Sequence, residues 1–314
     1  MPGAATPLEE AGFDVELLST GGPPPARVLC AAVVGADALV CQLNDTIDDD
    51  VLKAGGQTLR VVANVAVGVD NVDLASAHRR GVTVSNTPGV LDAATADLAM
   101  ALLLAVTRRV LQGVELIRTG RWTGFAATSS LGRDLAGMRL GLVGFGRIGR
   151  KVAQRAAAFE MVVHHHARHE TGASGYVASL DALLAESDAV SLHVPLTPHT
   201  RHLLDQRRLD LLPAGAVIIN TARGQVLDEA ALASSLRSGR LGGAGLDVFD
   251  NEPSVSATLL EAPNVVLTPH IGSATTETRG AMCSLAVQSV IELLAGRAWP
   301  HLVVDPGDRA SGGR

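Results

Sequence analysis

Three polar residues late in the chain could together assist the reduction of a carbonyl group. Arg223 lies in NTARGQ, Glu252 in VFDNEP and His270 in LTPHIG. Reduction of a ketone builds negative charge on oxygen, so the site needs a proton donor, and histidine donates well near neutral pH. A neighbouring carboxylate favours the charged imidazolium, and an arginine can clamp a substrate carboxylate through two hydrogen bonds. Singly, each could be a surface cation, a loop acid or a strand-end cap; together they predict acid–base chemistry on a keto acid.

A glycine-rich turn precedes these residues in the segment GLVGFGRIGR. It places Gly144, Gly146 and Gly149 in a G-x-G-x-x-G pattern, directly after an apolar run and at the start of a helical pattern. Such a turn brings the backbone close to a pyrophosphate, and the helix N-terminus then offers N–H groups to it. A purely structural turn is the alternative, but the setting between strand and helix predicts dinucleotide binding.

The next predicted strand ends in VVHHHARHE, where dinucleotide-binding proteins usually carry an acid that holds the adenosine ribose. Ala167 removes the repulsion that such an acid would exert on a 2′-phosphate, and Arg168 offers that phosphate a charge-assisted partner. His165, His166 or His169 could assist if protonated. We therefore expect NADP as the cofactor. NAD remains possible if the strand end is only solvated and other contacts bind the cofactor.

Neither a metal site nor a disulfide framework is expected. The histidines at 164–166 alternate faces along a strand, so they cannot converge on one ion. Cys30, Cys41 and Cys283 are too few and too scattered for zinc or for a set of disulfides. We interpret them as reduced thiols.

Alternating strands and helices must position these groups. From about residue 136 onward, short apolar runs alternate with amphipathic stretches, which predicts parallel βαβ units in an open doubly wound sheet. Arg223, Glu252 and His270 each follow a predicted strand of this region, where such sheets place their ligand crevice. The expected strands are 138–144, 161–166, 189–194, 216–220, 243–249 and 264–269, and the expected helices are 147–159, 180–188 and 227–239.

The first 90 residues repeat this style more weakly. Candidate strands are DVELL, ADALVC, RVVANV and TVSN, and one long helix over 91–120 is expected to link the two regions. A final helix over 275–296 could return the chain to the first region. We therefore expect two α/β domains, with the first built from both ends of the chain.

Composition narrows the class of protein. The chain has 314 residues, of which 47% are hydrophobic and 18% charged, as in compact globular proteins. Its formal charge of -6 argues against nucleic acid as a partner. The start MPGAATPLEEAGFDVELL has no basic, apolar leader pattern, and the apolar segment 98–106 is too short to span a membrane. A cytoplasmic protein without a membrane partner is expected.

Taken together, the motifs resemble the D-isomer-specific 2-hydroxyacid dehydrogenase family over nearly the whole chain. The resemblance rests on the glycine-rich turn and on further blocks in the same order, among them VANVAVGVDNVD, NTPGVLDAATADLA, ESDAVSLHVPLTPHTRHLL, INTARGQVLDE, GLDVFDNEP and LTPHIGSAT. It implies two doubly wound parallel-sheet domains, with a Rossmann nucleotide domain inserted in a flavodoxin-like substrate domain. The implied boundaries are 1–93 and 276–314 for the substrate domain and 94–275 for the nucleotide domain.

The resemblance also implies a role for individual residues. Arg223 would bind and polarise the substrate, His270 would be the acid–base residue with Glu252 as its partner, and the backbone at Val67 and Gly68 would hold the substrate carboxylate. Asp247 would face the nicotinamide carboxamide. Positions that would contact the cofactor are Thr95, Gly144, Gly146, Arg147, Ile148, Gly149, Ala167, Arg168, Pro195, Thr200, Thr221, Ala222, Asp247, His270 and Gly272.

Within the family, the block VANVAVGVDNVD and the Ala167–Arg168 strand end are most similar to glyoxylate/hydroxypyruvate reductases, which generally prefer NADPH. We therefore expect reduction of glyoxylate or hydroxypyruvate to the D-2-hydroxy acid. Alternatives are an NAD-dependent D-lactate or phosphoglycerate-type dehydrogenase, and a dinucleotide-sensing module similar to the corepressors built on this scaffold.

Two further expectations concern assembly and the chain start. The family's dimers form through the nucleotide domain and an arm near 120–132, so a homodimer is expected; the arm has Trp122 and Phe125, the latter where a second tryptophan is common. Members normally begin with a strand, and this chain opens at TPLEEAGFDVELL. Either the small domain is shorter here or the recorded start lies too late.

Overall fold

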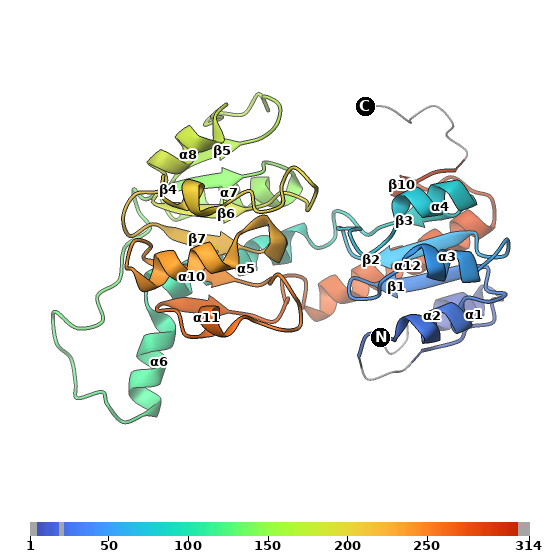
Figure 1. The fold of residues 1–314 in the computed structure, drawn as a ribbon, viewed down its shortest axis with the longest axis horizontal. Helices are drawn as coiled ribbons and strands as arrows, with labels where there is room; N and C mark the ends of the chain where they lie inside the picture. Colours follow the sequence, from blue (N-terminus) through green and yellow to red (C-terminus); the bar gives the residue numbers. More distant parts are fainter. Residues whose placement is uncertain (1–4, 19–21, 307–314) are drawn as a thin grey trace. The chain divides into compact units, whose positions relative to one another are not determined.

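The computed structural model describes residues 5–18 and 22–306, and these form two compact units (Figure 1). One unit comprises the described residues up to Leu91 together with those from Thr275 onward, and the other comprises Asp92–Ala274. Residues 1–4, on which the expectation about a leader partly rests, residues 19–21 and the residues after 306 lie outside the described residues.

The larger unit is built on a six-stranded sheet in which every pairing is parallel. The strand order is β5-β4-β6-β7-β8-β9, so the chain reverses its direction of travel across the sheet between β4 and β6. Such a switch point opens the crevice in which doubly wound sheets bind their ligands. The strands are β4 (Arg139–Val143), β5 (Val162–His166), β6 (Ala189–Leu192), β7 (Val217–Asn220), β8 (Gly243–Leu246) and β9 (Val265–Leu267).

Helices cover both faces of this sheet, and its central strands β4, β6, β7 and β8 are buried on both sides. One buried cluster joins α5 (Asp92–Thr107) and α7 (Arg147–Ala158) to one face. The other cluster joins the second face to α8 (Leu180–Glu186), α9 (Gln206–Leu209), α10 (Glu229–Arg237) and α11 (Ala257–Leu260). The predicted α/β class and the Rossmann-type nucleotide domain are confirmed.

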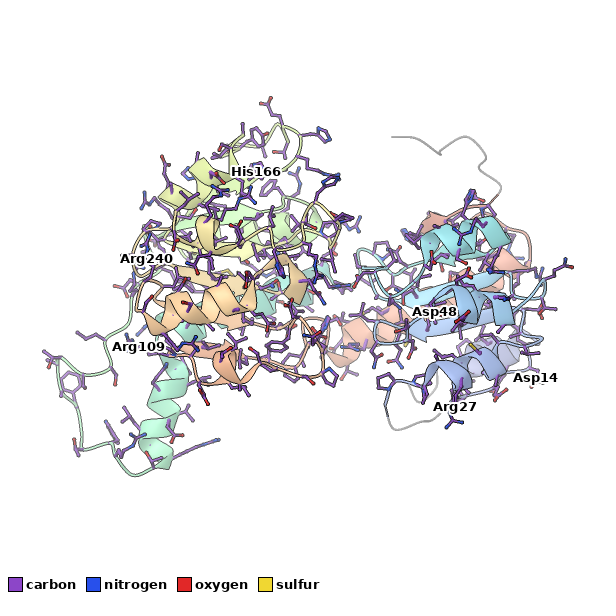
Figure 2. The ribbon with its side chains drawn as sticks, in the orientation of Figure 1. Asp14, Arg27, Asp48, Arg109, His166 and Arg240 are labelled. Carbon is purple, nitrogen blue, oxygen red and sulfur yellow. The ribbon has the colours of Figure 1, made fainter. Side chains whose placement is uncertain are left out.

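The single helix expected over 91–120 is wrong. The Thr107 hydroxyl bonds back to the Leu103 carbonyl at 2.8 Å, and Arg109 then adopts a left-handed φ of 52°, which breaks the helix (Figure 2). A separate helix, α6 (Val110–Arg118), follows and extends away from the sheet without burying any residue (Figure 1). The helix breaks where the chain leaves the core, a place that the continuous apolar pattern did not reveal.

The smaller unit has a four-stranded sheet in the order β1-β2-β3-β10. The parallel strands β1 (Ala38–Gln42), β2 (Val61–Val65) and β3 (Thr83–Ser85) match three of the four candidates, and β10 (Leu302–Val304) adds an antiparallel edge that the sequence did not predict. The helices are α1 (Thr6–Glu10), α2 (Ala26–Ala32), α3 (Asp49–Ala54), α4 (Leu74–Arg80) and α12 (Thr276–Leu294). Both chain ends therefore contribute to this unit, since α12 packs against β2.

The fourth candidate strand, DVELL at 14–18, is wrong. These residues belong to no strand, and Leu17 and Leu18 are 69% and 37% exposed. Alternating apolar residues form a strand only when one face is covered and a neighbouring edge accepts the backbone hydrogen bonds. β1 forms the edge of the sheet without them.

Two kinds of feature are absent from the described part of the chain. No helix among residues 5–18 and 22–306 is long and apolar enough to cross a membrane. The same residues hold no group of three or more His, Cys, Asp and Glu side chains arranged around a common point for a metal.

Candidate active site

Three neighbouring strands bring the candidate catalytic residues to one edge of the larger sheet. Arg223 follows β7, Glu252 lies in the turn after β8, and His270 follows β9. Because β7, β8 and β9 are adjacent and parallel, the segments that follow them leave the sheet at the same edge. Residues separated by 47 positions in sequence are thereby gathered in one unit.

Glu252 and His270 form a hydrogen-bonded pair. Nδ1 of His270 lies 2.8 Å from Oε2 of Glu252, and Oε1 accepts the Phe249 N–H at 3.0 Å. The side chains remain 28% and 34% exposed, so the pair faces solvent or a ligand. Since an ionised carboxylate only accepts hydrogen bonds, Nδ1 carries the hydrogen and Nε2 is left to exchange a proton with another group.

The charge state of Glu252 follows from its neighbours. Partial burial acts to raise its pKa, but the hydrogen bond and charge of His270, the Phe249 N–H and the charge of Arg223 outweigh burial, so the pKa is lowered from its ordinary value. The carboxylate is therefore ionised at neutral pH and available to stabilise an imidazolium.

The backbone at His270 is held in a conformation that non-glycine residues rarely adopt, with φ of 53°. Asp247 fixes this turn: its Oδ1 accepts the Thr268 hydroxyl at 2.6 Å and the Ile271 N–H at 2.8 Å, and its Oδ2 accepts the Gly272 N–H at 2.8 Å. Burial raises the pKa of Asp247 while these three donors oppose the rise. The contact predicted between Asp247 and the nicotinamide stays a prediction, since the carboxylate already serves the turn.

Arg223 sits in an extended segment that begins directly after β7. The Asn220 side chain bridges this segment, donating to the Arg223 carbonyl at 2.9 Å and accepting the Ala222 N–H at 3.0 Å. The guanidinium donates to the Ala222 carbonyl at 2.8 Å and is near enough to lower the pKa of Glu252 by its charge. The structure thus brings the predicted catalytic residues into one electrostatic group.

The glycine-rich turn has the form that a dinucleotide requires. Gly144 has φ of 96°, and a side chain there would meet the His193 carbonyl at 2.5 Å. A side chain at Gly149 would meet the Gly144 carbonyl at 2.4 Å, whereas one at Gly146 would enter open space. The backbone is therefore packed tightly on the protein side and open on the side where a pyrophosphate would approach the start of α7.

The remaining predicted cofactor positions lie on helices and on the segments that follow the strands of the larger unit. Thr95 and Gly272 lie together, since a side chain at Gly272 would meet Thr95 at 3.5 Å, and the Thr200 hydroxyl donates to the Pro195 carbonyl at 2.6 Å. The buried Thr221 hydroxyl has no hydrogen-bond partner among the described residues. A buried polar atom without a partner suits a site that a ligand completes. Ile148 and Ala222 are half-buried, and Arg147 lies 3.4 Å from Asp92.

The end of β5 differs from what the sequence led us to expect. His165 does not face a phosphate: its ring is buried, stacks on Phe145 at a centroid distance of 3.7 Å and lies 2.7 Å from the Thr171 hydroxyl. Burial lowers the pKa of His165, with the charge of Arg150 adding to the effect, so the ring stays neutral. His166, the last residue of the strand, lies with its Nδ1 atom 3.1 Å from the Val177 carbonyl oxygen (Figure 2).

The residues beyond His166 are more open. Ala167 is half-buried, while Arg168 and His169 are exposed. The strand end therefore presents a small side chain followed by an accessible cation. Of His165, His166 and His169, the three histidines expected to assist, only His169 is exposed.

The predicted carboxylate-binding loop lies in the smaller unit, after β2. Asn64 donates to the Gly68 carbonyl at 2.9 Å, and Asn86 donates to the Val67 carbonyl at 2.8 Å. Within residues 5–18 and 22–306, nothing accepts the N–H of Val67 or Gly68. With both carbonyls engaged, two successive N–H groups are left to bind an anion.

Known proteins are similar to this chain in both sequence and fold. The model of the D-isomer specific 2-hydroxyacid dehydrogenase NAD binding domain matches residues 100–272. The chain belongs to the D-isomer-specific 2-hydroxyacid dehydrogenase family. The glyoxylate reductase of Thermococcus litoralis is 44% identical over 305 residues, covering 94% of this chain and 91% of that protein.

Solved structures of similar proteins share the fold of this chain. The TT0316 protein from Thermus thermophilus is 47% identical with a TM-score of 0.90, and 96% of each chain is covered. An NADPH-dependent glyoxylate/hydroxypyruvate reductase from Sinorhizobium meliloti, crystallised with NADP and malonate, is 35% identical with a TM-score of 0.81, covering 88% of this chain and 86% of that one.

As a D-2-hydroxyacid dehydrogenase, the protein is an oxidoreductase with a nicotinamide-dinucleotide-binding domain.

Several contacts around the candidate site were not predicted from the sequence. Asn64 could have been suspected, because it is a polar residue inside the apolar run RVVANV and is fully buried. The stack of Phe145 on His165, and Arg150 over Phe145 at 4.6 Å, had no signal, since it joins a loop, a strand and a helix.

Proposed function

We propose that the protein reduces glyoxylate or hydroxypyruvate to glycolate or D-glycerate. The main observation behind the proposal is the hydrogen-bonded pair of His270 and Glu252. Arg223 lies close enough for its charge to lower the pKa of Glu252. The glyoxylate reductases among its relatives support the choice of substrate. When bound, a reduced nicotinamide supplies the hydride that the keto carbon accepts.

The residues of the chain supply the proton and the electrostatic stabilisation. His270 gives the proton on Nε2 to the carbonyl oxygen as negative charge develops there, and ionised Glu252 stabilises the imidazolium beforehand. Arg223 binds the substrate through its guanidinium and polarises the carbonyl. The N–H groups of Val67 and Gly68 hold the substrate carboxylate.

We assign the cofactor site to the glycine-rich turn and the positions around it. Gly144, Gly146 and Gly149 shape the turn, Arg147 and Ile148 begin the helix that faces the pyrophosphate, and Ala167 and Arg168 receive the adenosine ribose. The other proposed contacts are Thr95, Pro195, Thr200, Thr221, Ala222, Asp247, His270 and Gly272. NADP is the favoured cofactor, because Arg168 is exposed beside a residue too small to block a 2′-phosphate.

Initial rates test the proposal directly. NADPH and NADH are each measured against glyoxylate, hydroxypyruvate and pyruvate. We expect NADPH to be favoured by about tenfold or more, the scale of one charge-assisted hydrogen bond, with glyoxylate or hydroxypyruvate as the best substrate. A preference for NADH would reject the assignment of Arg168, and a preference for pyruvate would instead indicate a D-lactate-type dehydrogenase.

We also propose that the active form is a homodimer. The arm formed by α6 and the loop after it exposes large apolar side chains that a second copy would cover: Val110, Leu111, Val114, Ile117, Trp122, Phe125 and Leu131. Figure 1 shows this arm extending from its sheet. Sedimentation velocity should give a dimer that the Ile117→Asp variant weakens, because a charge would be buried at the interface. A monomeric wild type would reject the proposal.

A further inference from the structure

The turn that carries Glu252 rests on the segment that follows Arg223. A side chain built at Gly224 would lie 1.9 Å from the Phe249 carbonyl carbon and 2.4 Å from the Asp250 nitrogen, so the two backbones are in direct contact there. The Gln225 side chain also donates to the Asp250 carbonyl. The position of Glu252 therefore depends on groups beyond its own turn.

Glu229 is the acidic member of this support. It is the first residue of α10, is only 9% exposed, and its Oε1 accepts the Asp250 N–H at 2.7 Å. A glutamate at a helix start usually remains in water, where the helix dipole already favours it. In this buried position it bonds to Asp250, two residues before Glu252, and to the Ser256 side chain.

The charges around the turn connect Glu229 to the pair at His270. Burial raises the pKa of Glu229, the Asp250 N–H opposes the rise, and the charges of Asp250 and Glu252 add to it. Glu252 itself faces His270 and Arg223, and Asp250 lies 4.0 Å from His202. The pKa of Glu229 is raised, chiefly by burial and in part by the charge of Glu252, whereas His270 and Arg223 lower the pKa of Glu252.

We propose that Glu229 is a positioning residue for the reduction: its carboxylate fixes the turn from which Glu252 reaches His270, and its negative charge helps to keep the imidazole protonated. The inference rests on the proposed role of His270 as proton donor. Glu229 makes none of the hydrogen bonds of the Glu252–His270 pair itself, so its contribution is separable by mutation.

Two substitutions separate the acceptor from the charge. Glu229→Gln keeps an oxygen for the Asp250 N–H but removes the charge, and Glu229→Ala removes both. We expect Glu229→Ala to lower kcat about tenfold with little change in KM, since a displaced Glu252 affects the reaction more than ground-state binding. Glu229→Gln should restore most of kcat.

The pH profile reports the charge. In the direction of reduction, activity falls at alkaline pH as the proton donor is lost. Removing a nearby negative charge makes the donor's proton easier to lose, so the alkaline limb should move to lower pH in both variants, including the active Glu229→Gln protein.

Asp228→Ala is the matched control. Asp228 caps the same helix by accepting the Ala231 N–H at 3.0 Å. Among the described residues, it is Glu229 and not Asp228 that accepts the Asp250 N–H. If Asp228→Ala lowers kcat as much as Glu229→Ala, the effect is loosening of α10 and the inference is overturned. It is also overturned if the Glu229→Gln limb coincides with that of wild type, a readout that remains even if Glu229→Ala does not fold.

His270→Gln and Glu252→Gln are measured in parallel. If His270→Gln keeps wild-type activity, the proposed function falls and the inference falls with it. If both of these variants lose activity while the Glu229 variants match wild type in kcat and pH profile, only the inference fails. A lowered kcat in Glu229→Ala, its rescue in Glu229→Gln and a displaced limb in both establish it.

Discussion

The turn at His270 and the strand end at Arg168 have different proposed roles and are built differently. Asp247 holds the turn with three hydrogen bonds, and His270 keeps a left-handed backbone within it. Arg168 is exposed on the segment just after β5. Proton transfer depends on an oriented donor at a short distance, whereas attraction between a cation and a phosphate tolerates movement.

This difference indicates where the chain can change without losing its chemistry. Substitution at the turn should damage the reaction, because each residue there orients another. Substitution at the strand end should change which cofactor binds and leave the reaction intact. The predictions below test that division, from the largest expected effect to the smallest.

Replacing His270 with glutamine should have the largest effect. Glutamine retains hydrogen-bonding groups but cannot deliver a proton, so kcat/KM should fall by about 10³-fold, within the usual range for general acid–base catalysis. Cofactor affinity, measured by quenching of tryptophan fluorescence or by calorimetry, should change little. A loss of less than tenfold would show that the proton comes from elsewhere.

Arg168→Asp should reverse cofactor choice. The substitution removes a charge-assisted partner and adds repulsion, so the ratio of kcat/KM for NADPH to that for NADH should fall about 100-fold. The maximal rate with NADH should stay close to wild type, because the turn at His270 is untouched. Arg201→Asp is the control, since Arg201 is also exposed but follows β6; an equal fall there would indicate a general electrostatic effect.

The sequence predicted one of these regions better than the other. The strands β4 to β9 and the motif residues after them follow from alternating apolar and helical patterns, so the edge that gathers Arg223, Glu252 and His270 could be foreseen. The pattern VVHHH did not show that His165 is buried under Phe145, because which strand face is covered depends on a loop brought there by the fold.

The other predictions from sequence that were wrong also failed because contacts made by the fold decided the structure. The apolar pattern continues through residues 91–120, yet the chain leaves the core at Arg109 and starts a second helix. The segment 14–18 alternates like a strand and packs Val15 against the core, but it pairs with no strand. β10 pairs with β3 across more than 200 residues of sequence, a distance at which local patterns carry no information. Tertiary contacts, which periodicity does not contain, decide each case.

Glu252→Gln should lower kcat and also narrow the pH range of the reaction. The pKa of Glu252 is lowered in the folded protein, so the carboxylate stays ionised, and the pair is lost only as pH falls through this lowered value. Without the carboxylate, the imidazolium of His270 loses a favourable charge, and the alkaline limb of the reduction should move down by about one pH unit. A pH–rate profile with unchanged limits would contradict the electrostatic role of the pair.

The smallest effects are expected at the glycine-rich turn, where two alanine substitutions should separate folding from binding. A side chain at Gly149 meets the Gly144 carbonyl at 2.4 Å, so Gly149→Ala should lower the free energy of unfolding by about 1–3 kcal/mol. A side chain at Gly146 meets only open space, so Gly146→Ala should fold as well as wild type yet bind the dinucleotide several-fold more weakly, since the methyl group occupies the approach of the pyrophosphate. Urea unfolding measures the first effect and calorimetric titration the second. If Gly146→Ala bound the cofactor as tightly as wild type, the open side of this turn would not be the phosphate site, whereas the assignment of the turn at His270 would be unaffected.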